Sequence, residues 1–273
     1  MPLISVLIGT LYRQRDISFL KRSIRSILGQ TMADMEVLVC DDGSTEDAKC
    51  WLDGLSAQDG RLVLVRQGDL LALPQKLNAC IRQAKGQWLA RMDDDDYAAS
   101  DRFEKQIAFL DAHPEIAFVG SCAKACKSGA EAGVLVFPPL PEVKDFFFSQ
   151  PFLHPSLMFR RQALLQVNGY SEDVHCILCE DYDLLLRLYA AGYRGANIQE
   201  TLLTYTLPET AKGSRRMRHR WNEAVTRYRR FQELKVLPAA LPYVVKPIAV
   251  GLLPGRLLHN LKELRQSRTG REN

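Results

Sequence analysis

The chain has 273 residues, with 36 Lys and Arg against 32 Asp and Glu, which gives a net charge of +4. Hydrophobic residues make up 47% and charged residues 25%, so a disordered chain, a collagen-like repeat and a coiled coil are excluded for most of the sequence. This length allows one large domain, or one domain with a substantial tail. A charge of +4 is too small to indicate a nucleic-acid partner, and none is expected.

The first half of the chain alternates short apolar segments with segments of helical periodicity. Strands are expected at residues 4–10, 36–42, 61–67, 87–92 and 116–124. Helices are expected at 17–28, 73–85 and 100–113, the last ended by Pro114. This alternation predicts an α/β fold with a single, mostly parallel, Rossmann-like sheet flanked by helices. Ligands bind such sheets at the carboxyl ends of the strands.

The alternation loosens after residue 124. Glycines and prolines between 129 and 141 predict a loop region. A strand is expected at 153–161, a helix at 180–192 that is closed by Gly192, and a further strand at 201–206.

Seven cysteines, an odd number, are spread through the chain, and several lie inside apolar runs. This favours free thiols in a reducing compartment over a disulfide framework. The pairs Cys122/Cys126 and Cys176/Cys179 allow a zinc site, but neither has a histidine at finger spacing, so free thiols are preferred. The N-terminus lacks the basic region of a signal peptide, which predicts a cytoplasmic protein.

Charge divides the chain at Lys212. Residues 1–211 hold 21 basic and 28 acidic residues, a net of −7, and residues 212–273 hold 15 and 4, a net of +11. We therefore expect an α/β domain over 1–211 and a basic, apolar helical extension over 212–273. Residues 236–258 contain four prolines and two basic residues, which makes a spanning helix unfavourable. Two interpretations stay open: peripheral binding to the anionic inner face of the plasma membrane, or packing on the domain.

Acidic residues end or follow three predicted elements: Asp41-Asp42, Asp93 to Asp96, and Glu180-Asp181. A run of four aspartates is usually a solvated surface, but this run directly follows an apolar strand. Crowded carboxylates raise one another's pKa unless a cation offsets their charge. Mg²⁺ and Mn²⁺ bind carboxylate oxygens and complete their coordination with water and substrate phosphates. The pattern predicts a metal–diphosphate site.

Other phosphate-binding classes lack their motifs here. Neither G-x-x-x-x-G-K-[ST] nor G-x-G-x-x-G occurs, which excludes the P-loop and dinucleotide fingerprints. Cys40 stands where a haloacid-dehalogenase phosphatase needs its nucleophilic aspartate, so that class is excluded too.

A set of motifs runs through residues 3–206 in the order SVLIGTLY, SILGQT, VLVCDDGST, ARMDDDD, DRFEKQIAFLDAHPEIAFVGS, HPSLMFRR and NGY…EDYDLLLRLYAAG. In content and order these motifs resemble the family 2 glycosyltransferases of the GT-A fold. The resemblance implies a metal-dependent hexosyltransferase that moves a sugar, with inversion, from a nucleotide-diphosphate donor. The implied acceptor is a glycan or lipid-linked sugar in bacterial cell-surface polysaccharide synthesis.

The resemblance also implies a nucleotide-sugar site. Thr10 and Tyr12 would line its pocket, although this chain has Gly9-Thr10-Leu11-Tyr12 where the family usually has Pro-Thr-Tyr-Asn. Asp41 would accept a hydrogen bond from the imide N–H of the base, which favours a UDP-sugar donor. Asp42 would support the pocket.

The MDDDD motif corresponds to the family's D-x-D. Asp93 would lie near the ribose and the metal, Asp94 would belong to the nucleotide-sugar site, and Asp95 would bind Mn²⁺ or Mg²⁺. With four consecutive aspartates, the register of the metal ligands stays open by one residue.

Two further residues are implied in catalysis. An inverting displacement needs a base for the acceptor hydroxyl, and Asp181 would be that base, kept ionised by the amides of its helix N-terminus. His154 would lie near the acceptor or the diphosphate. The structural alternatives are helix capping for Asp181 and a purely structural histidine.

Two other functions remain as alternatives. A sugar-nucleotide pyrophosphorylase would need a glycine-rich basic loop after the first strand, whereas residues 9–15 hold one glycine and two arginines. A non-catalytic membrane scaffold could bind sugar nucleotides without turnover.

Overall fold

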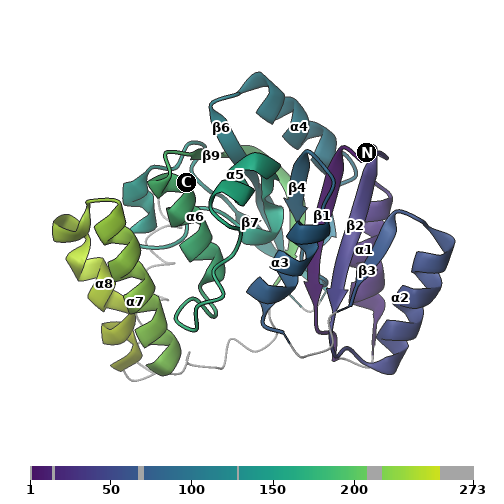
Figure 1. The fold of residues 1–273 in the computed structure, drawn as a ribbon, viewed down its shortest axis with the longest axis horizontal. Coiled ribbons are helices and arrows are strands. Elements are labelled where there is room, and N and C mark those ends of the chain that lie inside the picture. The colour runs from purple at the N-terminus through teal and green to yellow at the C-terminus, as the bar shows by residue number, and fades with distance from the viewer. Residues whose placement is uncertain (1, 14–15, 67–70, 128, 208–216, 253–273) are drawn as a thin grey trace. The chain divides into compact units, whose positions relative to one another are not determined.

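A computed structural model describes residues 2–13, 16–66, 71–127, 129–207 and 217–252 of the chain (Figure 1). The described residues form two compact units. The first consists of the chain up to Glu172 and the part that resumes at Glu180; the second joins Asp173–Cys179 to the helices after residue 216. The expected domain boundary at 211/212 lies outside the described residues.

The first unit is built on one sheet with the strand order β3-β2-β1-β4-β8-β6-β9-β5. Its first half is parallel and consists of β1 (Ile4–Thr10), β2 (Met35–Asp41), β3 (Leu62–Val65) and β4 (Trp88–Arg91). All four strands were expected, because strands buried on both faces are recognisable as continuous apolar runs.

The second half of the sheet is mixed. β8 (Met158–Arg160) runs antiparallel to β4 and to β6 (Ile116–Lys127), while β9 (Arg194–Thr206) is parallel to β6. β5 (Tyr97–Ala98) pairs with β9, and β7 (Ala130–Leu135) pairs with β6, both antiparallel. The α/β fold with a mostly parallel sheet is therefore confirmed, with antiparallel strands in its second half.

Helices cover both faces of the sheet. α1 (Ser18–Leu28), α2 (Glu46–Gln58) and α4 (Arg102–Ala112) share one hydrophobic core with the side chains of Val6, Ile8, Val37 and Val39. α3 (Leu73–Gln83) covers the opposite face, where the Cys80 thiol contacts the carbonyl of Leu38 at 3.5 Å. α6 (Glu180–Ala190) is the helix expected at 180–192.

Two local expectations were wrong in part, and one helix was not expected. Residues 130–135 are the strand β7 rather than loop; most of them are exposed, so no apolar alternation marks the strand. Within 153–161 only β8 is strand, because His154–Ser156 is a 3₁₀ turn and Arg161–Gln166 is the helix α5. Pro155, which has no N–H to donate to a sheet, suits that turn. α2 was not expected, since only Ala48 and Leu52 of this helix are buried.

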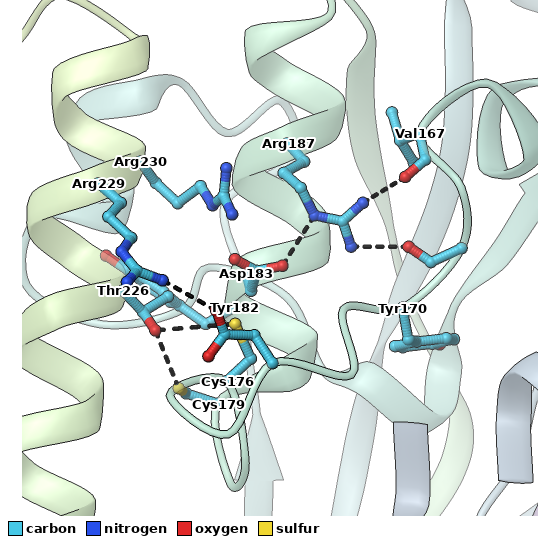
Figure 2. Close-up of polar contacts among 12 residues, drawn as sticks. Val167, Tyr170, Cys176, Cys179, Tyr182, Asp183, Arg187, Thr226, Arg229 and Arg230 are labelled. Atoms are coloured by element: carbon cyan, nitrogen blue, oxygen red, sulfur yellow. Dashed lines mark hydrogen bonds and ion pairs between the residues drawn. The ribbon is translucent and has the colours of Figure 1, made fainter. Parts of the chain in front are cut away.

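The second unit is a helical hairpin with one added segment. α7 (Met217–Glu233) turns into α8 (Leu237–Leu252) through Lys235, whose φ of 59° is the left-handed conformation of many helix ends. Thr226 of α7 faces Cys176 and Cys179, as Figure 2 shows, and Arg229 pairs with Asp173 at 3.0 Å. All seven cysteines of the chain are free thiols.

Candidate active site

The carboxyl ends of three neighbouring parallel strands form one edge of the sheet. Thr10 ends β1 in register with Asp41, which ends β2, and Arg91 ends β4 on the other side of β1. The Thr10 hydroxyl donates a hydrogen bond to the Asp94 carboxylate. Two of the predicted site residues therefore meet directly, although they are 84 positions apart.

A buried lysine that was not expected joins this edge. Lys76 of α3 forms an ion pair with Asp42, whose side chain is 1% exposed, and donates to the carbonyl oxygen of Thr10 at 2.5 Å. The second Asp42 oxygen accepts from the backbone N–H of Leu71. α3 can come this close because residue 9 is glycine: a β-carbon there would lie 3.1 Å from Lys76 Cβ. The sequence did contain a signal for Lys76: this basic residue lies three positions after Leu73, on the apolar side of a predicted helix.

Asp41 and Tyr12 belong to one hydrogen-bonded turn. The backbone N–H of Ser44 donates to Asp41 Oδ1 at 3.2 Å, and the Ser44 hydroxyl accepts from the backbone N–H of Tyr12 at 2.8 Å. The Tyr12 ring is buried in the core, and its hydroxyl donates to the carbonyl of Asp16 at 2.9 Å. Burial, with the charge of Asp94, raises the pKa of that phenol.

The four aspartates after β4 have four different surroundings. Asp93 forms an ion pair with the buried Arg91, and Asp94 accepts from Thr10. Asp96 is fully buried and accepts from the backbone N–H of Thr206 at 2.8 Å; burial, then the charge of Asp93, raises its pKa to about 8. Asp95 is half-buried and has no side-chain partner among the described residues. Burial, then Asp93 and Asp94, raise the pKa of Asp95 to about 6.

These surroundings suit a divalent cation. The charges of Asp93 and Asp94 oppose the ionisation of Asp95, so a cation bound there would relieve a repulsion that already exists. Within the described parts of the chain, no three His, Cys, Asp or Glu side chains are placed to hold a metal by themselves. A metal held by one or two of these carboxylates, with phosphate oxygens completing its coordination, fits both observations.

Asp181 lies in the first turn of α6. Its Oδ1 accepts from the backbone N–H of Tyr182 at 2.7 Å, and its Oδ2 accepts from the side-chain amide of Gln150 at 3.0 Å. The helix N-terminus and both hydrogen bonds favour the carboxylate over the acid. No sequence pattern marked Gln150, because it contacts Asp181 from a separate loop.

His154 is buried beside Tyr170. Its Nε2 lies 2.7 Å from the Tyr170 hydroxyl, and the two rings meet edge to face. Burial, then the charge of Arg91, lowers the pKa of His154 well below its usual value, so the ring is neutral at pH 7. Asn78 of α3 holds Tyr170 through two backbone hydrogen bonds, of 2.8 and 2.9 Å.

The pKa values of two tyrosines are affected both by the aspartates after β4 and by Asp181. Burial raises the pKa of Tyr205 to about 12, with contributions from Asp93, Asp96, Asp95 and Asp181 in that order. Burial also raises the pKa of Tyr170; Arg91 opposes the shift, and Asp181 and Asp93 add to it. The charges of the aspartates after β4 and of Asp181, at the start of α6, therefore reach the same two tyrosines.

Known proteins are similar to this chain in sequence and in fold. Residues 5–167 match the family model described as Glycosyl transferase family 2. The putative glycosyltransferase EpsE of Bacillus subtilis (strain 168) is 29% identical over 265 residues, which is 97% of this chain and 94% of EpsE. An Escherichia coli relative, UDP-Gal:alpha-D-GlcNAc-diphosphoundecaprenol beta-1,3-galactosyltransferase, is 27% identical over 219 residues, or 77% of each chain.

A solved structure supports the same fold. The mannosyltransferase PcManGT from Pyrobaculum calidifontis, in complex with GDP-Man and Mn²⁺, superposes with a TM-score of 0.64 at 19% identity, over 96% of this chain and 80% of that one. Because the family model covers more than half of the sequence, the chain belongs to glycosyl transferase family 2 and is a glycosyltransferase.

Proposed function

We propose that this glycosyltransferase transfers a hexose from a UDP-sugar to a hydroxyl of a glycan or lipid-linked acceptor during cell-surface polysaccharide synthesis. The observation that carries the proposal is the acidic edge of the sheet. Thr10, Asp41 and the aspartates after β4 meet there, and Asp181 shares their electrostatic environment.

The uracil base would be recognised by Asp41. One oxygen of this buried carboxylate accepts from Ser44, and the other has no partner among the described residues. That oxygen suits the imide N–H of uracil. The E. coli relative, which is named for a UDP-Gal donor and a diphosphoundecaprenol-linked acceptor, supports both the nucleotide and the class of acceptor.

The metal would be held by Asp95, with Asp93 beside it. Asp95 is the aspartate of the turn without a side-chain partner among the described residues, whereas Asp93 is paired with Arg91 and Asp94 with Thr10. Bound Mn²⁺ or Mg²⁺ would act as a Lewis acid that neutralises the leaving diphosphate. PcManGT, whose complex contains Mn²⁺, supports this metal for the fold.

Asp181 would act as the base in a single displacement. The acceptor oxygen bonds to the anomeric carbon as the bond from that carbon to the diphosphate oxygen breaks, and the acceptor proton moves to the Asp181 carboxylate. The hydrogen bonds from Tyr182 and Gln150 would favour the ionised carboxylate before the step.

Replacing Asp181 with Asn tests the proposed base. Because the amide cannot take the proton, we expect kcat to fall by about 100-fold or more, with donor binding by thermal shift retained. Asp111→Asn, on the exposed face of α4 outside the site, is the control and should leave kcat within about twofold. Full activity of the Asp181→Asn variant would refute the assignment.

The reaction products distinguish the proposed transfer from the two alternatives. A pyrophosphorylase would form a UDP-sugar from UTP and a sugar 1-phosphate, whereas a transferase releases UDP only when donor and acceptor are both present. A non-catalytic scaffold would bind the donor without releasing UDP.

We further propose that the second unit attaches to an anionic membrane surface. α8 exposes Leu241, Val245 and Leu252 at helical spacing, with Leu252 73% exposed, and α7 exposes Trp221 at 58%. α7 also carries five arginines. An exposed apolar stripe beside basic side chains is typical of helices that lie in the membrane interface. Among the described helices, none is long and apolar enough to cross a bilayer.

A further inference from the structure

α1 carries a cluster of three basic side chains. Lys21, Arg22 and Arg25 lie within one turn of the helix, and none of them forms a salt bridge within the described parts of the chain. Arg25 stands three and four positions after the other two, so the like charges repel one another on the helix surface. This repulsion is unfavourable for the helix, and a bound anion would offset it.

The three side chains line a pocket of about 520 Å³ between α1 and the segment around β5. Among the residues that the structure describes, no acidic one lines it; its other residues are Ser18, Ser26, Gly29, Tyr97, Ala98 and Ser100. The Tyr97 ring is 42% exposed. The neighbouring Asp16 is occupied by Ser18, which donates to it from both its backbone and its hydroxyl at 2.9 Å. The pocket is therefore positively charged and rich in hydroxyl groups.

Arg22 is fixed in place at this pocket. Its Nη2 donates to the carbonyl of Asp95 at 3.1 Å and contacts the Thr206 hydroxyl at 3.4 Å. Its Nε is buried and has no hydrogen-bond partner among the described residues. A buried N–H without a partner is unfavourable unless a ligand or water accepts from it.

The pocket adjoins the proposed donor site but lies on the other face of the sheet. α1 packs on the face of the sheet that α2 and α4 cover, whereas Lys76 and its partner Asp42 lie on the side of α3. Asp95 is the link between the two, since its backbone carbonyl meets Arg22 and its carboxylate belongs to the acidic site.

We propose that this pocket binds a phosphate-bearing ligand. Two guanidinium groups offer forked donors that match phosphate oxygens, and Lys21 adds a third positive charge. The phosphate belongs either to a free phosphorylated molecule or to the headgroup of a lipid. This binding goes beyond the proposed sugar transfer and uses none of the residues assigned to it.

Charge reversal at Arg25 tests the pocket with the full-length chain. Inorganic pyrophosphate is titrated by calorimetry in EDTA, because without a divalent cation the aspartates after β4 repel anions. Arg25→Glu should weaken binding about tenfold or more. Arg82→Glu is the matched control and should change binding less than about twofold, since Arg25 and Arg82 are each the basic residue in the last turn of a helix. Thermal melts check that both variants fold.

Vesicles distinguish the two sources of phosphate. Sedimentation with phosphatidylcholine vesicles, with and without phosphatidylglycerol, is compared for the same two variants. If Arg25→Glu lowers only pyrophosphate binding, the ligand is a free phosphorylated molecule; if it also lowers binding to the anionic vesicles, the ligand is a lipid headgroup. The proposal is overturned if neither probe separates Arg25→Glu from Arg82→Glu.

Discussion

The carboxylates at the sheet edge fall into two groups: those held by protein partners and those with an oxygen left to bind a ligand. Asp42 is tied to Lys76, Asp94 to Thr10, and Asp96 to the backbone of Thr206. Removing one partner of a buried ion pair such as Asp42–Lys76 typically costs about 3–5 kcal/mol, because the other charge stays buried. Among the described residues, Asp41 and Asp95 each keep a carboxylate oxygen free of such bonds. The proposed roles need this, because Asp41 would bind the nucleobase and Asp95 the metal.

Gln150 is a positioning residue for Asp181. In Gln150→Leu the hydrogen bond to Oδ2 is lost, so the charged carboxylate is less favoured and its pKa should rise. We expect kcat to fall about tenfold with the donor KM unchanged, and the acid limb of the pH profile to move to higher pH. Gln199→Leu, at an exposed amide outside the site, is the control. A pH profile that does not move would limit Gln150 to a structural role.

The buried His154 should make stability depend on pH. Its pKa in the folded protein is depressed, so below about pH 6.5 the unfolded chain takes up a proton that the folded chain does not. Stability is thus retained above that pH and lost as the pH falls, by at most ~1.4 kcal/mol per pH unit. In His154→Gln, urea unfolding between pH 7.5 and 5.5 should show a shallower decline. Parallel curves for the two proteins would contradict this.

Between elements, glycines set how closely the chain segments approach. Gly86, just before β4, lies against β1: a β-carbon at this residue would be 2.5 Å from the backbone nitrogen of Ser5. Its N–H also donates to the Ser5 hydroxyl at 2.8 Å. Gly86 thus permits the parallel pairing of β1 with β4, which in turn places Thr10 beside the aspartates after Arg91.

Two glycine-to-alanine changes should have opposite effects. Gly86→Ala forces the backbones of β1 and the β4 entry apart and should destabilise the fold by ~2 kcal/mol or more. Gly54→Ala lies inside α2 with nothing within 4 Å of the new methyl group, so it should stabilise by ~0.5–1 kcal/mol. Denaturant midpoints measure both, and equal effects at the two positions would refute the packing argument.

For the whole molecule, the net charge of +4 is the sum of two parts of the chain that carry opposite charge. Residues 1–211 carry −7, much of it in the acidic clusters of the site, and residues 212–273 carry +11. Within the second unit, α8 adds an exposed apolar stripe to this positive charge. The combination suits a protein that works on acceptors held at an anionic surface.

The membrane proposal predicts a loss of vesicle binding when α8 becomes polar. Leu241→Asp combined with Val245→Asp should lower partitioning to phosphatidylglycerol vesicles about tenfold or more, because two apolar side chains no longer enter the interface. Leu165→Asp, at an exposed leucine of α5, is the control. Unchanged sedimentation of the double variant would exclude α8 as the contact.

Strands and helices with a strong apolar pattern were predictable. β1, β2, β4 and β6 were located within a few residues, because each is almost fully buried and most of its side chains are apolar. The shorter β3 was located from its run LVLV, of which two residues are buried. β7 and α2 were missed because few of their side chains are buried. Their sequences therefore show no regular spacing of apolar residues.

By itself, the sequence determined the family, the α/β class, the acidic residues after the strands and the division of charge, since all of these lie in local runs and motifs. The tertiary structure decided which carboxylates are held by hydrogen bonds or ion pairs with other residues. Lys76 meets Thr10 from 66 positions away, and Gln150 meets Asp181 from 31. Contacts between residues so far apart leave no local pattern. The pocket at α1 is of the same kind, because it exists only where β5 is brought beside the helix by the pairing of β5 with β9.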